Sequence, residues 1–254
     1  MMKLMIIILS AIFFLGSLNY TKNSISAADG EESLKETIIN NGKNITKTVV
    51  LVEDFTAVKF KGNALLKIEK ADVNELTLQV EESFTEKIDI FEKNKTLIIN
   101  FPETYRAAEP AQIVIKAKNI NDILLNGNNN LTITNLSNSD EFKLESDGIL
   151  TASMNIICKR LYIYTKSSAQ INLSGKSDLL KFNGKGLAVL NAKSHTTTSC
   201  DFRVDGNTNS IVNVTEKLFV KINGIGIVNF IGDPIIEKKL SSTGFIFKYD
   251  PNNK

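Results

Sequence analysis

Glycine-centred turns recur in the second half of this sequence at intervals of about twenty residues. The glycines concerned are Gly127, Gly148, Gly184, Gly206, Gly224 and Gly244. Where a further glycine is due, between Gly148 and Gly184, the chain has Ser167 and Ser168 instead. Most of these turns follow an apolar-x-apolar triplet, as Leu180-Lys181-Phe182 does before Asn183-Gly184. A repeat of two short strands and a turn cannot enclose a core alone, so the sequence requires repeats that pack on their neighbours.

Short strands rich in β-branched residues fill the rest of the chain, and no segment beyond the N-terminus shows sustained helical periodicity. Before the repeats we expect strands at Val49–Val52, Val58–Phe60, Leu65–Ile68, Leu76–Val80, Ile88–Phe91, Leu97–Phe101 and Ile113–Ile115.

Two all-β architectures fit this pattern. In an antiparallel meander or sandwich, the Asn-Gly and Asp-Gly pairs would form type I′ hairpins. In a parallel β-helix each repeat is one coil of about twenty residues, and glycine supplies the positive φ of a corner. The repeats match apolar on apolar and Asn on Asn, as stacking requires, which favours the parallel β-helix.

The N-terminus has the features of an export signal. Lys3 is a minimal basic region, and an apolar run of about fifteen residues follows from Leu4 to Leu18, shorter than a bilayer span. Ser26-Ala27-Ala28 offers small residues for cleavage, so we expect a signal peptide at 1–28. A polar leader at 29–44 would precede a single β-solenoid domain at 45–250. The mature chain would then contain no membrane-spanning segment and lie in the periplasm, on the outer surface or outside the cell.

The net charge of the chain limits the kinds of partner that it can bind. It is +2, which does not indicate a nucleic-acid-binding protein.

Cys158 and Cys200 are the only cysteines, and both precede the first strand of a repeat. Two repeats of stacking separate them by about 9.6 Å, beyond disulfide reach, unless a long loop at 192–199 brings Cys200 closer. The spacing favours free thiols.

A resemblance to a known family adds to this interpretation. The run from Phe219 to Pro234, with Gly224-Ile225-Gly226 and Gly232-Asp233-Pro234, resembles the closing motif of the putative autotransporter-adhesin, head GIN domain family. The segment from Val49 to Phe60 is similar to its entry motif. The resemblance covers residues 45–247 and implies a right-handed parallel β-helix, with no family-wide catalytic residues. The chain departs from the motif at Ser167-Ser168, at Asn207-Thr208 and in the 192–199 loop, where we expect less regular coils.

Catalytic and metal chemistry find little support in the sequence. Glu145 and Asp147 lie on the same side of one strand, about 6.6 Å apart, which makes them the one carboxylate pair suited to glycosidase action. Residues of this kind in a turn usually serve its geometry. His195, the only histidine, is expected in an exposed loop, and with two cysteines it matches no zinc signature. We therefore expect no cofactor and no metal.

The sharpest functional feature is a predicted exposed column. The middle residue of each apolar-x-apolar triplet points outward, because side chains of a strand alternate between its faces. These residues are Lys143, Tyr162, Lys181, Arg203 and Lys221. The next outward column contains Glu145, Tyr164, Asn183, Asp205 and Asn223. Lysine, arginine and two tyrosines in register could bind an anionic glycan, or could simply keep this face of the sheet soluble.

The sequence thus favours an exported, non-catalytic surface or periplasmic module for binding or adhesion, with anionic polysaccharide or another cell-surface component as partner. A polysaccharide-active β-helix enzyme and a purely structural envelope protein are the alternatives.

Overall fold

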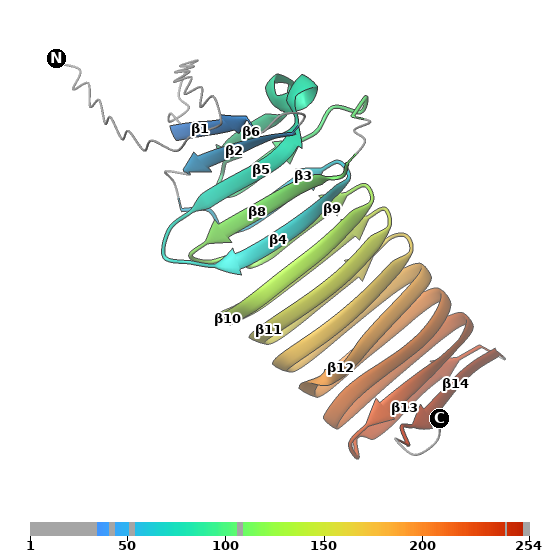
Figure 1. The fold of residues 1–254 in the computed structure, drawn as a ribbon. Helices are drawn as coiled ribbons and strands as arrows, with labels where there is room; N and C mark the ends of the chain where they lie inside the picture. Colours follow the sequence, from blue (N-terminus) through green and yellow to red (C-terminus); the bar gives the residue numbers. More distant parts are fainter. Residues whose placement is uncertain (1–34, 41–43, 51–53, 106–108, 242, 251–254) are drawn as a thin grey trace.

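A computed structural model describes residues 35–40, 44–50, 54–105, 109–241 and 243–250. These residues form a single curled sheet of 14 strands and one short 3-10 helix, η1 (Glu82–Lys87). The sheet is elongated, with its first strands at one end and its last strands at the other (Figure 1). The predicted signal peptide lies outside the described residues, and β1 lies within the segment expected as a polar leader.

The strands fall into two sets. The N-terminal set contains β1 (Lys35–Asn40), β2 (Asn44–Val50), β3 (Ala57–Lys61), β4 (Ala64–Lys70), β5 (Glu75–Glu81), β6 (Asp89–Lys93), β7 (Thr96–Asn100) and β8 (Ala111–Ala117). The C-terminal set contains β9 (Asp122–Asn126), β10 (Asn129–Asp147), β11 (Leu150–Thr165), β12 (Ala169–Ile231), β13 (Ile235–Leu240) and β14 (Thr243–Lys248).

The prediction of one right-handed parallel β-helix over 45–250 is wrong, because the sheet is mixed. In the N-terminal set, β1 pairs with β2, β2 with β5, β5 with β8 and β6 with β7, all antiparallel. Parallel pairing joins β3 to β7 and β9, and β4 to β8 and β10. The strands of the C-terminal set are also paired in parallel.

Turn chemistry accounts for part of the antiparallel pairing. Asn94 and Lys95 both have positive φ, 52° and 59°, which is the backbone of a two-residue type I′ hairpin. So short a turn brings β6 and β7 together as neighbours of opposite direction, whereas parallel neighbours need a long crossover.

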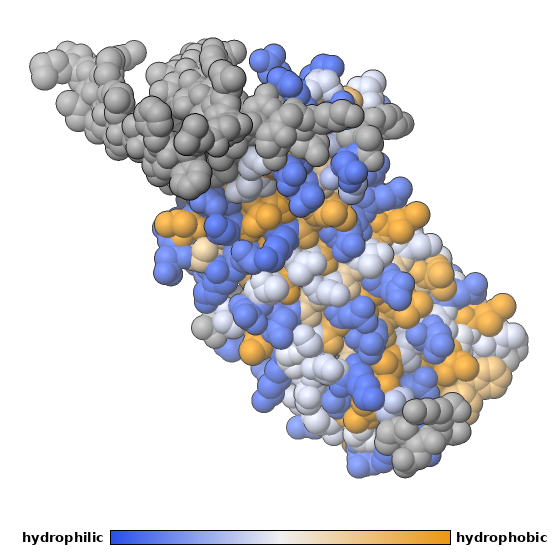
Figure 2. All heavy atoms as spheres, in the orientation of Figure 1, coloured by the Kyte–Doolittle hydropathy of each residue, from blue (hydrophilic) through white to orange (hydrophobic). Residues whose placement is uncertain are grey.

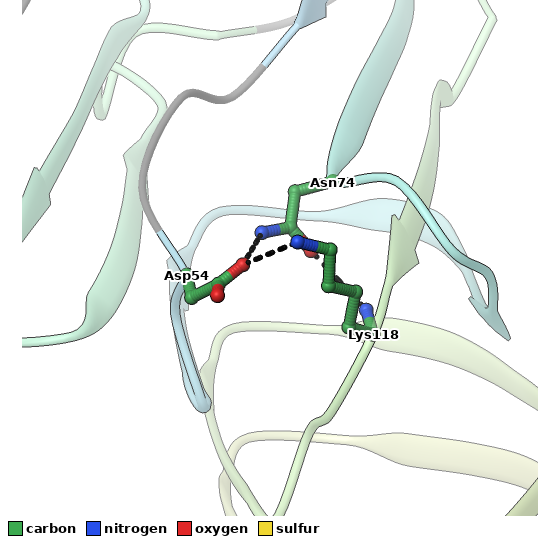
Figure 3. A network of polar contacts seen from close by, with 3 residues as sticks. All are labelled: Asp54, Asn74 and Lys118. Carbon is green, nitrogen blue, oxygen red and sulfur yellow. Dashed lines mark hydrogen bonds and ion pairs between the residues drawn. The ribbon is translucent and has the colours of Figure 1, made fainter.

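A polar network at the end of this antiparallel part links three loops (Figure 3). The Asn74 amide donates to Asp54 Oδ1 at 3.0 Å, and Lys118 Nζ donates to the same oxygen at 3.0 Å. The Lys118 backbone N–H donates to Asn74 Oδ1 at 3.1 Å. Because Asn74 is buried, these bonds satisfy polar groups that would otherwise be costly to remove from water.

Two walls of parallel strands enclose the core of the C-terminal part. We call the first wall β4, residues 129–134, 150–155, 169–174 and 225–230, the parts of β12 around Asn191 and Thr208, and β14. The second wall contains β3, β9, residues 143–147, 160–165, 179–184 and 217–222, the part of β12 around Phe202, and β13. The long strands β10, β11 and β12 bend from one wall to the other, and residues with positive φ lie within β10 and β12, among them Asn135 at 53° and Gly186 at 68°.

Inward side chains of both walls form one hydrophobic core, with Phe60, Phe142, Phe182 and Phe202 among its largest fully buried members. The alternation of buried and exposed positions along β11 and β12 is that of strands with one face inward. On the face shown in Figure 2, hydrophilic and apolar residues are interspersed over the length of the sheet. None of the helical structure in the described residues is long and apolar enough to cross a membrane.

Glycines stack where the strands of successive repeats turn. A Cβ added to Gly148 would meet the backbone of Gly127, and one on Gly206 would meet that of Gly186. Next to these glycines, the backbone N–H of Asn128 donates to Asn63 Oδ1 at 2.7 Å, and that of Ile149 donates to Asn128 Oδ1 at 3.2 Å. The turns of successive repeats are thus held together by close backbone contact and by asparagine side-chain oxygens. These oxygens accept hydrogen bonds from backbone N–H groups at the corner of the next repeat.

Candidate functional site

The predicted column lies on the outer face of the second wall. Lys143 is opposite Tyr162 in the register of β10 and β11, and Tyr162 is opposite Lys181 in that of β11 and β12. The three side chains are half-buried. In the neighbouring column Glu145 is opposite Tyr164, and Tyr164 is opposite Asn183. The structure therefore brings these six residues together as the sequence arranged them.

Tyr162 and Tyr164 form the aromatic centre of this face. They lie two residues apart on β11, so both point outward. Their rings are nearly parallel, with 6° between the planes and 6.4 Å between centroids. Lysines on the two adjacent strands flank Tyr162. Two aligned aromatic faces beside ammonium groups can pack against an apolar ring face and contact its acidic substituents.

Beyond Lys181 the strand register differs by two residues from the alignment of the repeats in the sequence, in which Arg203 follows Lys181. Phe182 stacks on Phe202 with ring centroids 5.0 Å apart, and Ser177 Oγ donates to Thr197 Oγ1 at 3.0 Å. Both contacts join residues twenty apart, as does the contact of Gly186 with Gly206. The structure thus places Gly186, not Gly184, beside Gly206.

This register places Asp201 beside Lys181, and Arg203 beside Asn183. Arg203 donates through Nε and a terminal nitrogen to both Asp201 carboxylate oxygens, at 2.7 and 3.0 Å. The bidentate contact raises the pKa of Arg203 further. The guanidinium also lies 4.9 Å from the centre of the Phe219 ring. Arg203 is thus an oriented cation whose charge Asp201 partly offsets.

Lys143 is also paired. Its Nζ lies 3.0 Å from Glu145, which is 3.3 Å from Lys166 as well. These partners lower the pKa of Glu145, chiefly through the hydrogen bond with Lys143, and raise the pKa of Lys143. Asp122 lies opposite Lys143 on β9, where burial raises the pKa of its carboxyl group. The Lys143 end of the column therefore has mixed charge.

Nearer the C-terminus the predicted column is not continuous, because Arg203 and Lys221 lie in the neighbouring column, after Tyr164 and Asn183. Asn223 donates to Asp205 Oδ1 at 3.0 Å, a register that places Lys221 beside Arg203. Lys221 is opposite Lys239 of β13. Among the ion pairs of the described residues, Lys181, Lys221 and Lys239 have no partner. Sequence reasoning missed Lys239, because β13 lacks the apolar-x-apolar triplet: Lys238 is found where its first apolar residue is due.

We call this surface the basic-aromatic face. Its members are Lys143, Tyr162, Tyr164, Lys181, Arg203, Lys221 and Lys239.

Of the two carboxylates considered for catalysis, Glu145 is held in ion pairs with Lys143 and Lys166. A general acid needs a raised pKa, whereas ion pairing lowers that of Glu145. No group of three or more His, Cys, Asp or Glu side chains able to hold a metal ion occurs in the part of the chain that the structure describes.

The prediction of an exposed His195 in a loop is wrong. Residues 192–199 continue β12 as strand, and the histidine is fully buried. Its Nε2 lies 2.9 Å from Ser177 Oγ and its Nδ1 3.3 Å from the Ser174 carbonyl oxygen. Burial lowers the pKa of the ring, so it is held neutral. Cys158 and Cys200 are buried free thiols.

A second surface feature lies on the first wall. It is a groove of about 330 Å³, whose outer lining includes Thr132, Ser153, Asn172 and Asn191. These four uncharged side chains come from successive repeats, and the Asn191 amide donates to Asn172 Oδ1 at 3.1 Å. Because the Asn191 amide bonds to Asn172 of the preceding repeat, the groove serves the packing of these repeats as well as exposing polar atoms.

Comparison with known proteins places this geometry in a family. The model of the family described as "Putative auto-transporter adhesin, head GIN domain" matches residues 54–234. No curated protein matches the sequence.

Similar folds occur among solved structures. A putative adhesin from Bacteroides fragilis is 20% identical, with a TM-score of 0.75 over 82% of this chain and 97% of that chain. A putative adhesin from Parabacteroides merdae is 19% identical, with a TM-score of 0.62 over 83% and 98%. A putative lipid binding protein from Parabacteroides distasonis is also 19% identical, with a TM-score of 0.63 over 83% and 98%. At these identities the likeness is one of fold.

Proposed function

This chain belongs to the putative auto-transporter adhesin, head GIN domain family, and we propose that it is an exported, non-catalytic binding module of the cell surface or periplasm. Its ligand on this proposal is an anionic glycan, bound along the basic-aromatic face. The observation that carries the proposal is the parallel pair of Tyr162 and Tyr164 with a lysine on each adjacent strand.

The aromatic pair supplies the apolar part of the binding energy. A pyranose ring has an apolar face that packs on an aromatic ring through many weak dispersion contacts. Tyr162 and Tyr164 are half-buried, so each ring is fixed while part of it stays accessible. Fixed aromatic side chains lose little conformational entropy when a ligand binds.

The unpaired lysines supply the charge. Lys181 is opposite Tyr162, and Lys221 and Lys239 continue the cationic surface towards the C-terminus. Neighbouring strands are about 4.8 Å apart, so lysines on nearby strands can contact successive acidic groups of one polymer chain. Each exposed contact is weak, and several in series are needed for useful affinity.

Export is supported by the signal peptide predicted at 1–28 and by the adhesin description of the family. Fractionation of cells carrying a tagged copy, with surface protease treatment, would distinguish the outer surface from the periplasm. Recovery of the tagged chain in the cytoplasm would contradict the proposal.

Binding is tested by retention of the purified protein on immobilised polygalacturonate or heparin, with neutral dextran as the reference matrix. We expect Tyr162→Ala and Lys181→Glu each to weaken retention about tenfold while both variants stay folded at the temperature of the assay. Lys95→Glu, the same charge change in the β6–β7 turn, is the matched control and should retain wild-type binding. Equal retention of all three variants, or no retention of the wild type on either polyanion, would refute the proposal.

A further inference from the structure

The C-terminal end of the sheet is open at its edges (Figure 1). Strand β13 pairs on one side with residues 217–222, and β14 pairs on one side with residues 225–230. In the strand pairing of the described residues, neither strand has a neighbour on its other side. Such edges present backbone N–H and C=O groups that can pair with another strand.

The hydrophobic core is also open at this end. Leu218 is 1% exposed, and Ile236, its neighbour on the last strand of the second wall, is 39% exposed. Val220 is fully buried, whereas Lys238, opposite it, is exposed. The inward side of β13 therefore lacks the covering layer that every earlier strand of this wall has.

Apolar side chains are unusually exposed around the same end. Ile235 is 77% exposed, and Phe245 and Phe247 of β14 are 50% and 52% exposed. The two phenylalanine rings are nearly parallel, at 9°, with centroids 6.1 Å apart. At the opposite end of the second wall, Ile88 directly before the edge strand β6 is buried and Ile90 within β6 is half-buried, so the two ends differ.

We propose that the C-terminal end is a dimer interface, at which β13 pairs antiparallel with β13 of a second copy. The sequence of β13 is complementary to itself in this arrangement. With Lys238 on the two-fold axis, Glu237 faces Lys239 of the second copy, and Ile236 faces Leu240 of the second copy. Both contacts occur twice, as two-fold symmetry requires.

Side-chain alternation selects this register. Facing residues of an antiparallel pair point to the same side, so Ile236 and Leu240 can meet only if even-numbered residues face even-numbered ones. Sliding by two residues in one direction makes Glu237 face Glu237. Sliding in the other direction makes Lys239 face Lys239. Only the register centred on Lys238 joins opposite charges on the outer side and apolar residues on the inner side.

Lys238 is the unfavourable element of this register, because it faces its own counterpart next to the core. The same two-fold axis brings β14 beside its copy, where Phe245, Ile246 and Phe247 add apolar contact. The pairs of Glu237 with Lys239 make the contact specific, and Lys238 facing its counterpart limits its affinity. We therefore expect a specific dimer of moderate affinity, not open-ended aggregation.

Sedimentation velocity over a concentration series tests the proposal on the purified chain. We expect a reversible monomer–dimer equilibrium. Glu237→Lys and Lys239→Glu should each weaken the dimer about tenfold, because each places like charges opposite one another. The double variant exchanges the two charges and should restore wild-type affinity. Lys238→Val should tighten the dimer.

Asp178→Lys is the matched control, an exposed acid on β12 away from β13, and should dimerise as the wild type does. A chain that stays monomeric at all concentrations would overturn the proposal. So would a dimer indifferent to the β13 charges, or a double variant no better than the single ones. Growth into filaments would indicate head-to-tail contacts and would equally refute it.

Discussion

Replacement of Gly206 by alanine tests whether close approach of backbones sets the corners of this sheet. Gly206 has φ +139°, and a Cβ there would lie 2.1 Å from the carbonyl oxygen of Gly186 and 2.9 Å from its carbon and nitrogen. Cβ atoms essentially never come closer than 3.0 Å to such atoms, so the two backbones would have to separate by about 0.9 Å.

The magnitude follows from two contributions. An alanine in this φ region costs roughly 1–3 kcal/mol. Displacing the neighbouring strand weakens hydrogen bonds worth about 1 kcal/mol each. We therefore expect Gly206→Ala to lower the free energy of unfolding by roughly 3–5 kcal/mol.

Gly186→Ala is the matched control. Gly186 has φ +68°, but the nearest atom to an added Cβ is 3.7 Å away. The substitution carries the left-handed backbone cost of about 1–2 kcal/mol, partly offset because alanine also restricts the unfolded chain. Urea unfolding, followed by circular dichroism, measures the free energy of unfolding of both variants. A Gly206→Ala loss within about 0.5 kcal/mol of the Gly186→Ala loss would refute the steric argument.

Three further predictions concern buried polar groups. Burial lowers the pKa of His195 below 6.5, so as the pH falls the unfolded chain binds a proton at a higher pH than the folded chain does. The free energy of unfolding should therefore decrease as the pH drops below about 6.5. His195→Gln should lack this decrease between about pH 7.5 and 5.5. The same pH dependence of stability in the wild type and in His195→Gln would contradict this prediction. Asn74→Ala should cost roughly 1–3 kcal/mol in urea unfolding, with Asp72→Ala, an exposed change two residues away, near neutral. Burial raises the pKa of Cys158 to about 11 and raises that of Cys200 further, so iodoacetamide at pH 8 should modify both slowly, Cys158 first, until denaturant is added. Rapid labelling of the native protein would show that the thiols are accessible.

Local patterns predicted much of the strand content. The alternation in Leu76–Val80, Leu97–Phe101 and Ile113–Ile115 marked strands that the structure contains, because one face of each is buried. The family resemblance, read from the glycine steps between Gly224 and Pro234, is confirmed by the match over 54–234. The direction in which strands pair could not be read in the same way, since alternation is the same in parallel and antiparallel sheets.

His195 shows a second limit. A histidine among serines and threonines has the composition of a surface loop, and no local pattern indicated that it is buried. In the structure Ser177 and the Ser174 carbonyl satisfy the ring from the preceding repeat. That pairing depends on which repeat lies beside which, and no local signal encodes it.

By itself, the sequence determined that the chain forms repeated strands with glycine corners and that the middle residue of each apolar-x-apolar triplet points outward. Only the tertiary structure decided the register. Offsets of twenty and twenty-two residues both keep apolar residues inward, so alternation cannot distinguish Gly184 from Gly186 as the neighbour of Gly206. Two contacts in the structure select the offset of twenty residues: the stacking of Phe182 on Phe202 and the hydrogen bond from Ser177 to Thr197. This offset places Asp201, not Arg203, beside Lys181.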